Sequence, residues 1–381
     1  MRKQKAILLR LDLNVPLNHR TGEVLETTKI DTYLREIKKL SQKNKVIILS
    51  HLGKGDRVKD RLKPVADYLR QRLSKTQNQN LEVLENVRFW KGETEKEDSK
   101  IFRDLSKYFA ELGEEYINDA FASLHRSHAS IVGIPKVLRE RFKTKKEFQK
   151  KVRLGPLVNF EIKNLNRILR EMKKKSALLI LSGSKISTKL PLILRFLEDR
   201  LKVFVSGAIA NQILKDVLGY NIGLSWYEED FQMSEKDRQF LKESIAKGCL
   251  ILPKDVLLKD QQEKRVNSLH LRDRIVDLAR TSLKNLKEEI LKAKVVILNG
   301  PLGLYEEGFT VGTVEILEFL KWKAGTNKDF FVCFGGGDTL ALLEKVKIKS
   351  GKNIFLSTGG GAMLEYLAKN GDLPGIKAIK K

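Results

Sequence analysis

Short apolar runs that recur along the chain are the feature that most constrains its fold. Each has the length of a β-strand, and most are unbroken rather than alternating with polar residues. Unbroken runs are typical of strands covered on both faces, as in parallel sheets. The runs occupy residues 6–9, 46–49, 177–181, 203–205, 250–252, 295–298, 330–334 and 354–356. Apolar residues at helical spacing lie between them, so the pattern predicts an α/β fold.

The longest stretch without a strand signal, residues 135–175, divides the chain near its middle and contains a candidate amphipathic helix. We therefore predict two doubly wound parallel-sheet domains of the Rossmann-like kind, joined by a connecting helix, with an interdomain cleft. The predicted parts are an N-terminal domain (1–156), the connecting helix (157–173), a C-terminal domain (174–362), and a tail (363–381) that packs back toward the N-terminal domain.

Composition excludes several classes of protein. Hydrophobic residues make up 41% of the 381 and charged residues 32%, which is enough apolar material to exclude a wholly disordered chain. The apolar runs are far shorter than the ~18 residues that span a bilayer, so we expect no membrane partner. Two cysteines are too few for a disulfide framework, and the basic N-terminal stretch has too short an apolar run for a signal peptide. We expect a cytoplasmic protein.

The formal net charge of +25, from 73 Lys and Arg against 48 Asp and Glu, raises the question of a nucleic-acid partner. The densest basic block, residues 136–153, holds nine basic residues against Glu140 and Glu147, without a motif for stacking on bases. Elsewhere basic and acidic residues are interleaved, which is typical of a solvated surface. The pattern disfavours nucleic acid, although charge alone keeps a nucleic-acid-binding protein as an alternative.

In open parallel sheets, ligands bind beyond the carboxyl ends of the strands, so residues that follow each apolar run are candidates for a site. In the N-terminal half these residues are Asp12, Asn14, His51, Lys54, Arg88 and the run His125-Arg126-Ser127-His128. Such a cationic set suits a small phosphorylated carboxylate, because guanidinium groups bind phosphate and carboxylate through paired hydrogen bonds. A turn set by Pro16 and scattered surface charge are the alternatives.

In the C-terminal half, glycines follow the strands. Residues 335–339 (GGGDT) and 359–362 (GGGA) each precede a candidate helix, where exposed amides can bind phosphate. Lys185 and Lys189 follow residues 182–184 (SGS) at a predicted strand-to-helix junction, and we expect both ammonium groups on one face of the first helical turns, with the helix dipole adding to anion binding. Asp338 is a hard oxygen ligand suited to Mg²⁺. Plain loops and two unrelated lysines are the alternatives, and neither the P-loop nor the dinucleotide pattern occurs.

From about Leu9 to Ile376 the chain resembles phosphoglycerate kinase. The resemblance rests on motifs in the family's order: residues 12–16 (DLNVP), 50–53 (SHLG), 84–89 (LENVRF), 118–121 (NDAF), 125–130 (HRSHAS), Lys185, 299–301 (NGP), 335–339 (GGGDT) and 357–362 (STGGGA). It implies reversible phosphoryl transfer between 1,3-bisphosphoglycerate and ADP, giving 3-phosphoglycerate and ATP with Mg²⁺ in glycolysis. Closure of the domains around the substrates and a monomeric state are also implied.

The resemblance also implies roles for individual residues. The glycerate would be bound by Asp12, Leu13, Asn14, Lys29, His51, Leu52, Gly53, Lys54, Arg88 and Arg126. The nucleotide would be bound by Gly183, Lys185, Lys189, Gly207, Asn299, Gly300, Gly303, Glu306, Gly335, Gly336, Gly337, Asp338 and Thr339, with Asp338 as the metal ligand. Lys29, Lys185 and the amides around Gly337 and Gly360 would act catalytically by stabilising the phosphoryl group during transfer.

The chain departs from the family where it has Lys29 and Lys54 in place of arginine. A planar group with several donors becomes a point charge, which is not a conservative change. The altered glycine segments around Gly183 and Gly207, and the missing glycine near residues 275–278, put nucleotide preference in question. The resemblance therefore predicts an active, divergent kinase, with a catalytically weak pseudoenzyme of the same fold as an alternative.

Overall fold

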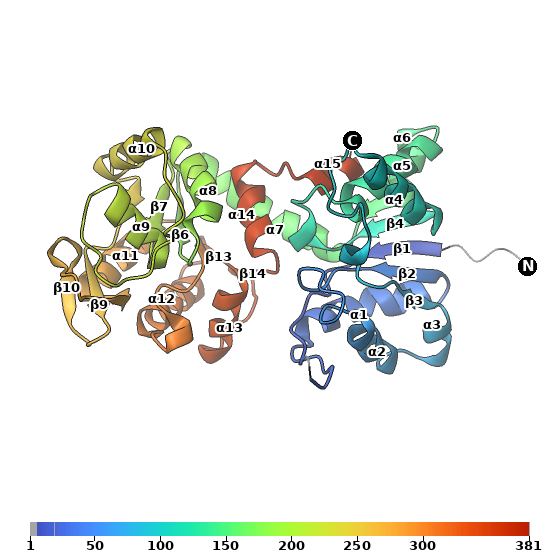
Figure 1. Cartoon of the computed structure of the whole chain (residues 1–381), viewed down its shortest axis with the longest axis horizontal. Coiled ribbons are helices and arrows are strands. Elements are labelled where there is room, and N and C mark those ends of the chain that lie inside the picture. The colour runs from blue at the N-terminus through green and yellow to red at the C-terminus, as the bar shows by residue number, and fades with distance from the viewer. Residues whose placement is uncertain (1–5, 19, 381) are drawn as a thin grey trace, which may run out of the picture. The chain divides into compact units, whose positions relative to one another are not determined.

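The structure is a computed structural model that describes residues 6–18 and 20–380. The chain folds into two compact units (Figure 1): unit 1 runs up to residue 163 and takes in the chain again from residue 372, and unit 2 covers residues 164–371. Each unit contains a parallel sheet with helices packed against it, so the predicted α/β, doubly wound class is confirmed. Among the described residues, no helix is both long and apolar enough to span a bilayer.

The sheet of unit 1 has the strand order β3-β2-β1-β4-β5, and all of its pairings are parallel. The strands are β1 Ala6–Arg10, β2 Lys45–Leu49, β3 Leu81–Val83, β4 Glu115–Asn118 and β5 Val152–Leu154. The helices are α1 Thr28–Ser41, α2 Lys63–Gln71, α3 Lys75–Gln79, α4 Lys100–Glu111, α5 Ile134–Arg141 and α6 Lys145–Lys151, with short turns η1 Val87–Phe89, η2 Phe121–Ser123 and the π-helix η3 Ala129–Gly133. Helix α1 packs through Ile30, Tyr33 and Ile37, which share one face and are buried.

Strand β5 lies within residues 135–175, so the prediction that this stretch holds no strand is wrong. The strand has only three residues and is defined by its pairing with β4, where Tyr116 is opposite Val152. A run this short carries no readable periodicity, because its strand character comes from a partner distant in sequence. The amphipathic helix expected in the same stretch is confirmed as α7 Pro156–Lys173. The last helix, α15 Pro374–Lys380, belongs to unit 1 and contacts β5.

The main sheet of unit 2 has the order β14-β13-β12-β6-β7-β8 and is also parallel. Its strands are β6 Ala177–Leu181, β7 Lys202–Val205, β8 Leu250–Ile251, β12 Val295–Asn299, β13 Phe331–Gly335 and β14 Ile354–Ser357. Its helices are α8 Ile186–Glu198, α9 Gly207–Asp216, α10 Glu235–Ala246, α11 Arg280–Lys292, α12 Val311–Thr326, α13 Gly337–Lys345 and α14 Gly360–Ala368.

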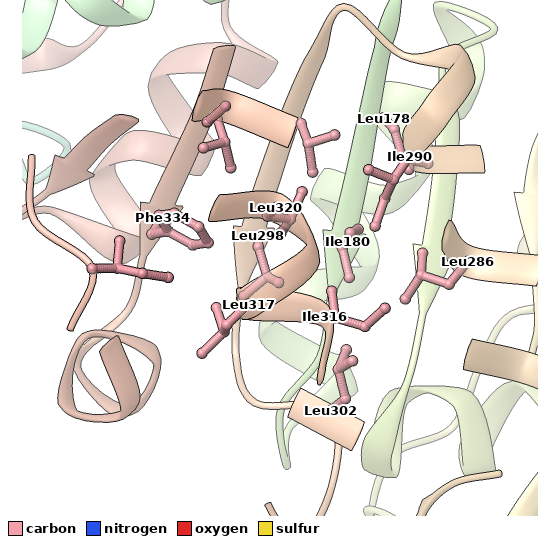
Figure 2. Packing of buried hydrophobic residues seen from close by; sticks show 14 of the residues in the cluster. Leu178, Ile180, Leu286, Ile290, Leu298, Leu302, Ile316, Leu317, Leu320 and Phe334 are labelled. Atoms are coloured by element: carbon pink, nitrogen blue, oxygen red, sulfur yellow. The ribbon is translucent and has the colours of Figure 1, made fainter. Parts of the chain in front are cut away.

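Both faces of this sheet are buried, which explains its unbroken apolar strands. Ile180, Leu298 and Phe334 point to the face covered by α11, α12 and α13, where they pack against Ile316 and Leu320 (Figure 2). The alternate residues of β6 and β12 point to the opposite face and are buried as well. Because successive side chains of a strand point to opposite faces, two covered faces require apolar residues at every position.

Unit 2 also contains a three-stranded antiparallel sheet that the sequence pattern did not indicate. Its order is β10-β9-β11, from β9 Asp255–Leu258, β10 Glu263–Arg265 and β11 Ile275–Leu278, with the turn η4 Val266–Ser268 between β10 and β11. Strand β10 is polar, so no apolar run marks it. Val256, Leu258 and Ile275 form a small core beneath this sheet with Leu214 of α9.

Candidate functional site

In unit 1, the predicted site residues lie where parallel strands end at one edge of the sheet. Arg10, the last residue of β1, is paired in register with Leu49 of β2 and Asn118 of β4. The segments that follow are joined across the edge. The amide of Leu13 donates to Ser50 Oγ at 2.9 Å, and the amide of Gly53 donates to Asn14 Oδ1 at 2.8 Å. The fold therefore brings the first two predicted motifs together.

Asp12 is buried and paired with Lys29. Lys29 Nζ lies 2.7 Å from Asp12 Oδ2 and donates to the carbonyl oxygen of Asn14 at 3.1 Å. Burial opposes ionisation of Asp12, but the positive charge and the hydrogen bond of Lys29 outweigh it and hold the pKa of Asp12 below its usual value. The amide of Asn14 donates to Asp12 Oδ1 at 3.2 Å, so the turn weighed as the alternative for this motif is present as well.

Two histidines in this region are held neutral. Burial and the positive charge of Arg10 lower the pKa of His51 to about 3, and burial with Arg126 and Arg10 lowers the pKa of His128 to about 3. Arg88 donates through Nη1 to the carbonyl of Gly53, and burial together with the charge of Arg126 lowers its pKa. These mutual effects show that the cationic side chains lie near one another and form one cluster, which suits an anionic ligand.

The remaining predicted residues of unit 1 occupy different environments. Leu13 and Leu52 have buried side chains that belong to the hydrophobic core, so only their backbone is available to a ligand. Lys54 and Arg126 are exposed. Asp119, in the NDAF motif, accepts a hydrogen bond from the amide of Val158 at 2.9 Å and so caps the start of α7.

Sequence reasoning missed Arg10 and Glu93, which are both buried in unit 1. Arg10 is 1% exposed and Glu93 is fully buried. A charged residue at the end of an otherwise apolar strand was the available signal for Arg10, because a buried charge requires a partner. Glu93 carries no local signal, since its partner Ser130 lies 37 residues away.

In unit 2, the glycine-rich segments converge at the carboxyl ends of the main sheet. Asn299 at the end of β12 is paired with Leu181 of β6 and Gly335 of β13. The amide of Gly300 donates to Thr339 Oγ1 at 2.8 Å. A Cβ on Gly360 would come within 2.8 Å of Gly336 Cα, so these two loops pack closely only because both residues are glycine. The segments open α13 and α14, as the sequence predicts.

Polar groups in this part of unit 2 are available to a ligand. Lys189 Nζ donates to Asn299 Oδ1, and burial lowers the pKa of Lys189 to about 8. Asn299 Nδ2 and Ser182 Oγ are buried and have no hydrogen-bond partner among the described residues. A Cβ atom at Gly335, Gly336 or Gly360 would lie within 3.4 Å of Asn299 Nδ2. Glycine at these three positions therefore lets the loops approach the side chain of Asn299 closely.

The expectation that Lys185 and Lys189 share the first helical turns is wrong for Lys185. Helix α8 begins at Ile186, and Lys185 is the exposed N-cap residue with extended backbone. The N-terminus of α8 is also occupied by a carboxylate, since Glu228 accepts from the amide of Ser187 at 2.9 Å and from its hydroxyl at 2.7 Å. The helix dipole is therefore already compensated by a side chain distant in sequence. Thr188 Oγ1 donates to the carbonyl of Lys185 at 3.1 Å.

The predicted metal ligand Asp338 lies exposed in the first turn of α13. Its Oδ1 accepts a hydrogen bond from the hydroxyl of Tyr305, in the turn η5 Tyr305–Glu307, at 2.7 Å. That hydrogen bond, together with burial, raises the pKa of Tyr305 to about 12. An exposed carboxylate in the first turn of a helix is the oxygen donor that Mg²⁺ prefers, so the residue fits the ion. Glu306, the predicted ribose ligand, is exposed in the same turn.

A hollow in unit 2 lies beside the segment that follows β12, since Leu302 and Gly303 line it. Gly207 and Gly303, both predicted nucleotide ligands, line it together with Leu278 and Trp226. The hydrogen-bonding side chains that line it are engaged within the protein: Ser206 Oγ donates to the carbonyl of Leu302, Asn211 Nδ2 donates to the carbonyl of Trp226, and Asp277 accepts from the amide of Gly312. The hollow therefore offers mainly apolar surface.

Part of the basic block of unit 1 is engaged within the protein. Lys136 pairs with Glu97, Lys151 and Arg153 pair with Glu115, and Arg139 lies over the ring of Phe148. Positive charge that is already paired releases few counterions on binding a polyphosphate. Nothing in the block favours the nucleic-acid alternative.

The chain is similar along its whole length to proteins of one family. Residues 1–370 match the family model described as phosphoglycerate kinase. Phosphoglycerate kinase of Psychrobacter cryohalolentis is 33% identical over 413 residues, covering 99% of this chain and 96% of the relative, and that of Malacoplasma penetrans is 32% identical over 416 residues, covering 99% and 84%.

Solved structures of phosphoglycerate kinases are similar to this chain as well. The structure of phosphoglycerate kinase from Coxiella burnetii matches with a TM-score of 0.76 at 31% identity and covers 99% of this chain and 96% of that one. Phosphoglycerate kinase from Pyrococcus horikoshii has the same fold, with a TM-score of 0.73 at 24% identity over 99% of this chain and 96% of that one. The chain therefore belongs to the phosphoglycerate kinase family.

Proposed function

We propose that the chain catalyses reversible, Mg²⁺-dependent transfer of a phosphoryl group between 1,3-bisphosphoglycerate and ADP, giving 3-phosphoglycerate and ATP in the cytoplasm, as a monomer. The observation that carries the proposal is the family match over residues 1–370. The cationic cluster of unit 1 and the amide-lined loops of unit 2 support it, because they suit a phosphorylated acid and a nucleotide respectively.

In unit 1, Asp12 and Asn14 would hydrogen-bond the glycerate hydroxyl, while His51, Arg88, Arg126 and Lys54 would bind its charged ends. The lowered pKa of His51, about 3, keeps the ring neutral, so that it can accept a hydrogen bond as well as donate one. Lys29 lies beside Asp12 and would neutralise charge on the phosphoryl group during transfer. The same polar atoms also hold the loops in place, so the site is preorganised.

In unit 2, Lys189 and Asn299 would bind the nucleotide phosphates, Gly207 and Gly303 would shape the space for the base, and Glu306 would accept from the ribose. Lys185 and the amides around Gly337 and Gly360 would bind the oxygens of the phosphoryl group in transit. Asp338 would hold Mg²⁺, which when bound neutralises negative charge on the phosphates. Closure of the units over the substrates would exclude the water that hydrolyses an acyl phosphate.

A coupled assay with 3-phosphoglycerate and MgATP tests the proposal. We expect turnover that requires both substrates, that is lost in Lys185→Met, and that is unchanged in the matched surface control Lys107→Met. Binding of both substrates without measurable turnover would instead identify the weak pseudoenzyme of the same fold. Failure to bind 3-phosphoglycerate would contradict the assignment altogether.

A further inference from the structure

A fully buried carboxylate lies behind the cationic cluster of unit 1. Glu93 Oε1 accepts from Ser130 Oγ at 2.6 Å and Oε2 accepts from the amide of Ser130 at 2.9 Å. The carbonyl of Glu93 accepts from the amide of Ala129 at 2.9 Å. Both the side chain and the backbone of Glu93 therefore fix the segment that follows Arg126 and opens the π-helix η3.

The contacts continue from Ser130 to Arg10. Arg10 Nε donates to Ser130 Oγ at 3.1 Å, and Arg10 Nη2 lies 3.4 Å from His51 Nδ1. Arg10 is 1% exposed, so its guanidinium is fixed by these partners and by the carbonyl of Leu11 rather than by water. A chain of contacts thus runs from Glu93 through Ser130 and Arg10 to His51, which belongs to the proposed acid site.

Glu93 is also a buried acidic group that faces this cluster. The charged and titratable groups that face it are Arg10 of β1, Arg88 of η1, His128 before η3, and Tyr116 of β4. His128 Nδ1 lies 3.7 Å from Glu93 Oε1. Removing one partner of a buried ionic network leaves the other charge without compensation, which is costly. Glu93 therefore compensates the charge of the arginines that face it.

We propose that Glu93 is a positioning residue for the acid-binding site, which holds Ser130 and Arg10 in place and opposes the charge of the cationic cluster. This inference rests on the proposed function, since the site is defined by its glycerate ligand. Glu93 contacts no substrate in this scheme and acts through Arg10 and the segment 126–130.

The ionisation of Glu93 gives the proposal a distinctive signature. Burial raises the pKa of Glu93 to about 7, although Arg10 and Ser130 oppose that rise. Of the groups that face it, His128 has a pKa of about 3 and the pKa of Tyr116 is raised above its usual value, so both stay neutral between pH 6 and pH 8. The arginines stay charged. Within this group only Glu93 changes charge in that range, from neutral at low pH to negative at high pH.

The test is calorimetric binding of 3-phosphoglycerate to the full chain and to Glu93→Gln from pH 6 to pH 8.5. Ionisation of the substrate affects both dissociation constants equally, so their ratio does not depend on it. We expect Glu93→Gln to bind 3-phosphoglycerate about tenfold more weakly at pH 8, the loss of one charge-assisted hydrogen bond, and the ratio to fall toward one at pH 6. ADP affinity should change less than twofold, and the control Glu97→Gln should match the unsubstituted chain.

A ratio that stays constant with pH would show a merely structural role and would overturn the proposal, as would unchanged binding at pH 8 or an equal loss of ADP affinity. Should Glu93→Gln fail to fold, Ser130→Ala removes the link between Glu93 and Arg10 while keeping both charges, and we expect the same pH-dependent ratio. Absence of 3-phosphoglycerate binding by the unsubstituted chain would contradict the proposed function and this inference together. Binding with a flat ratio would overturn the role of Glu93 alone.

Discussion

Lys29 Nζ lies 2.7 Å from Asp12 Oδ2, so the lysine that the resemblance places at an expected arginine position is held by a residue of the proposed acid site. Its ammonium group also donates to the carbonyl of Asn14. These contacts keep the positive charge at the site, while the planar set of donors that arginine would offer is absent. The substitution therefore changes the geometry of the site more than its charge.

Lys29→Arg should raise kcat about fivefold, the effect of roughly 1 kcal/mol on the barrier, because a second donor can bind the phosphoryl group in the transition state. Lys29→Met should lower kcat and leave ADP affinity unchanged. Steady-state kinetics with 3-phosphoglycerate and MgATP measures both effects, with Lys39→Arg on the outer surface of α1 as the control. An unchanged or lower rate for Lys29→Arg would show that the missing guanidinium does not limit turnover.

Lys189 should make nucleotide binding depend on alkaline pH. Burial lowers its pKa to about 8, so the ammonium form present below that pH is lost as the pH rises through it. Metal-free ADP should therefore bind more weakly from pH 8 to pH 10, with the midpoint moved upward by the bound phosphates. Lys189→Arg keeps its charge over this range and should give a flat profile in calorimetry. A profile in Lys189→Arg with the same slope as the unsubstituted chain would contradict this assignment.

His51 and His128 should stay neutral far below the usual pKa of a histidine. Both pKa values are lowered to about 3 by burial and by neighbouring arginines. NMR of the imidazole nitrogens should therefore show no protonation of either ring between pH 7.5 and pH 5. The unfolded chain binds these protons near pH 6.5, so both rings lower the stability of the native state as the pH falls through that value.

The variant His51→Gln isolates that contribution. The difference between its free energy of unfolding and that of the unsubstituted chain should increase in favour of the variant by up to about 1.4 kcal/mol for each pH unit below pH 6.5. Urea unfolding at pH 7 and pH 5 provides the comparison. Equal pH dependence of the two proteins would mean that His51 titrates normally in the folded state.

Tyr305→Phe should strengthen metal binding. The hydroxyl of Tyr305 donates to Asp338 Oδ1 at 2.7 Å and so competes with a cation for that oxygen. Losing one such hydrogen bond, worth about 1 kcal/mol, should raise the affinity for Mn²⁺ in the presence of ADP about fivefold, as measured by electron paramagnetic resonance. Asp338→Asn should abolish the tight site. Weaker Mn²⁺ binding in Tyr305→Phe would show that the hydroxyl orients the carboxylate for the metal instead.

The parallel strands and most positions of the candidate site follow from local pattern. Strands covered on both faces need apolar residues at every position, as in β6 and β12, and such runs are readable without a partner. Ligand-binding residues follow these strands because carboxyl ends of parallel strands share an edge. The sequence alone therefore predicted the fold class and the two chemically different groups of residues, one charged and one rich in glycine.

Only the tertiary structure decided which charges are buried and which groups are already engaged. Strand β5 and the polar strand β10 exist through pairing with partners that no local period reveals. Glu228 caps α8 although it lies 41 residues from Ser187 in the sequence, and Glu93 accepts a hydrogen bond from Ser130, which lies 37 residues away. Burial and partnership depend on residues distant in the chain, and they determine the pKa and orientation of each side chain. Residue type alone fixes neither property.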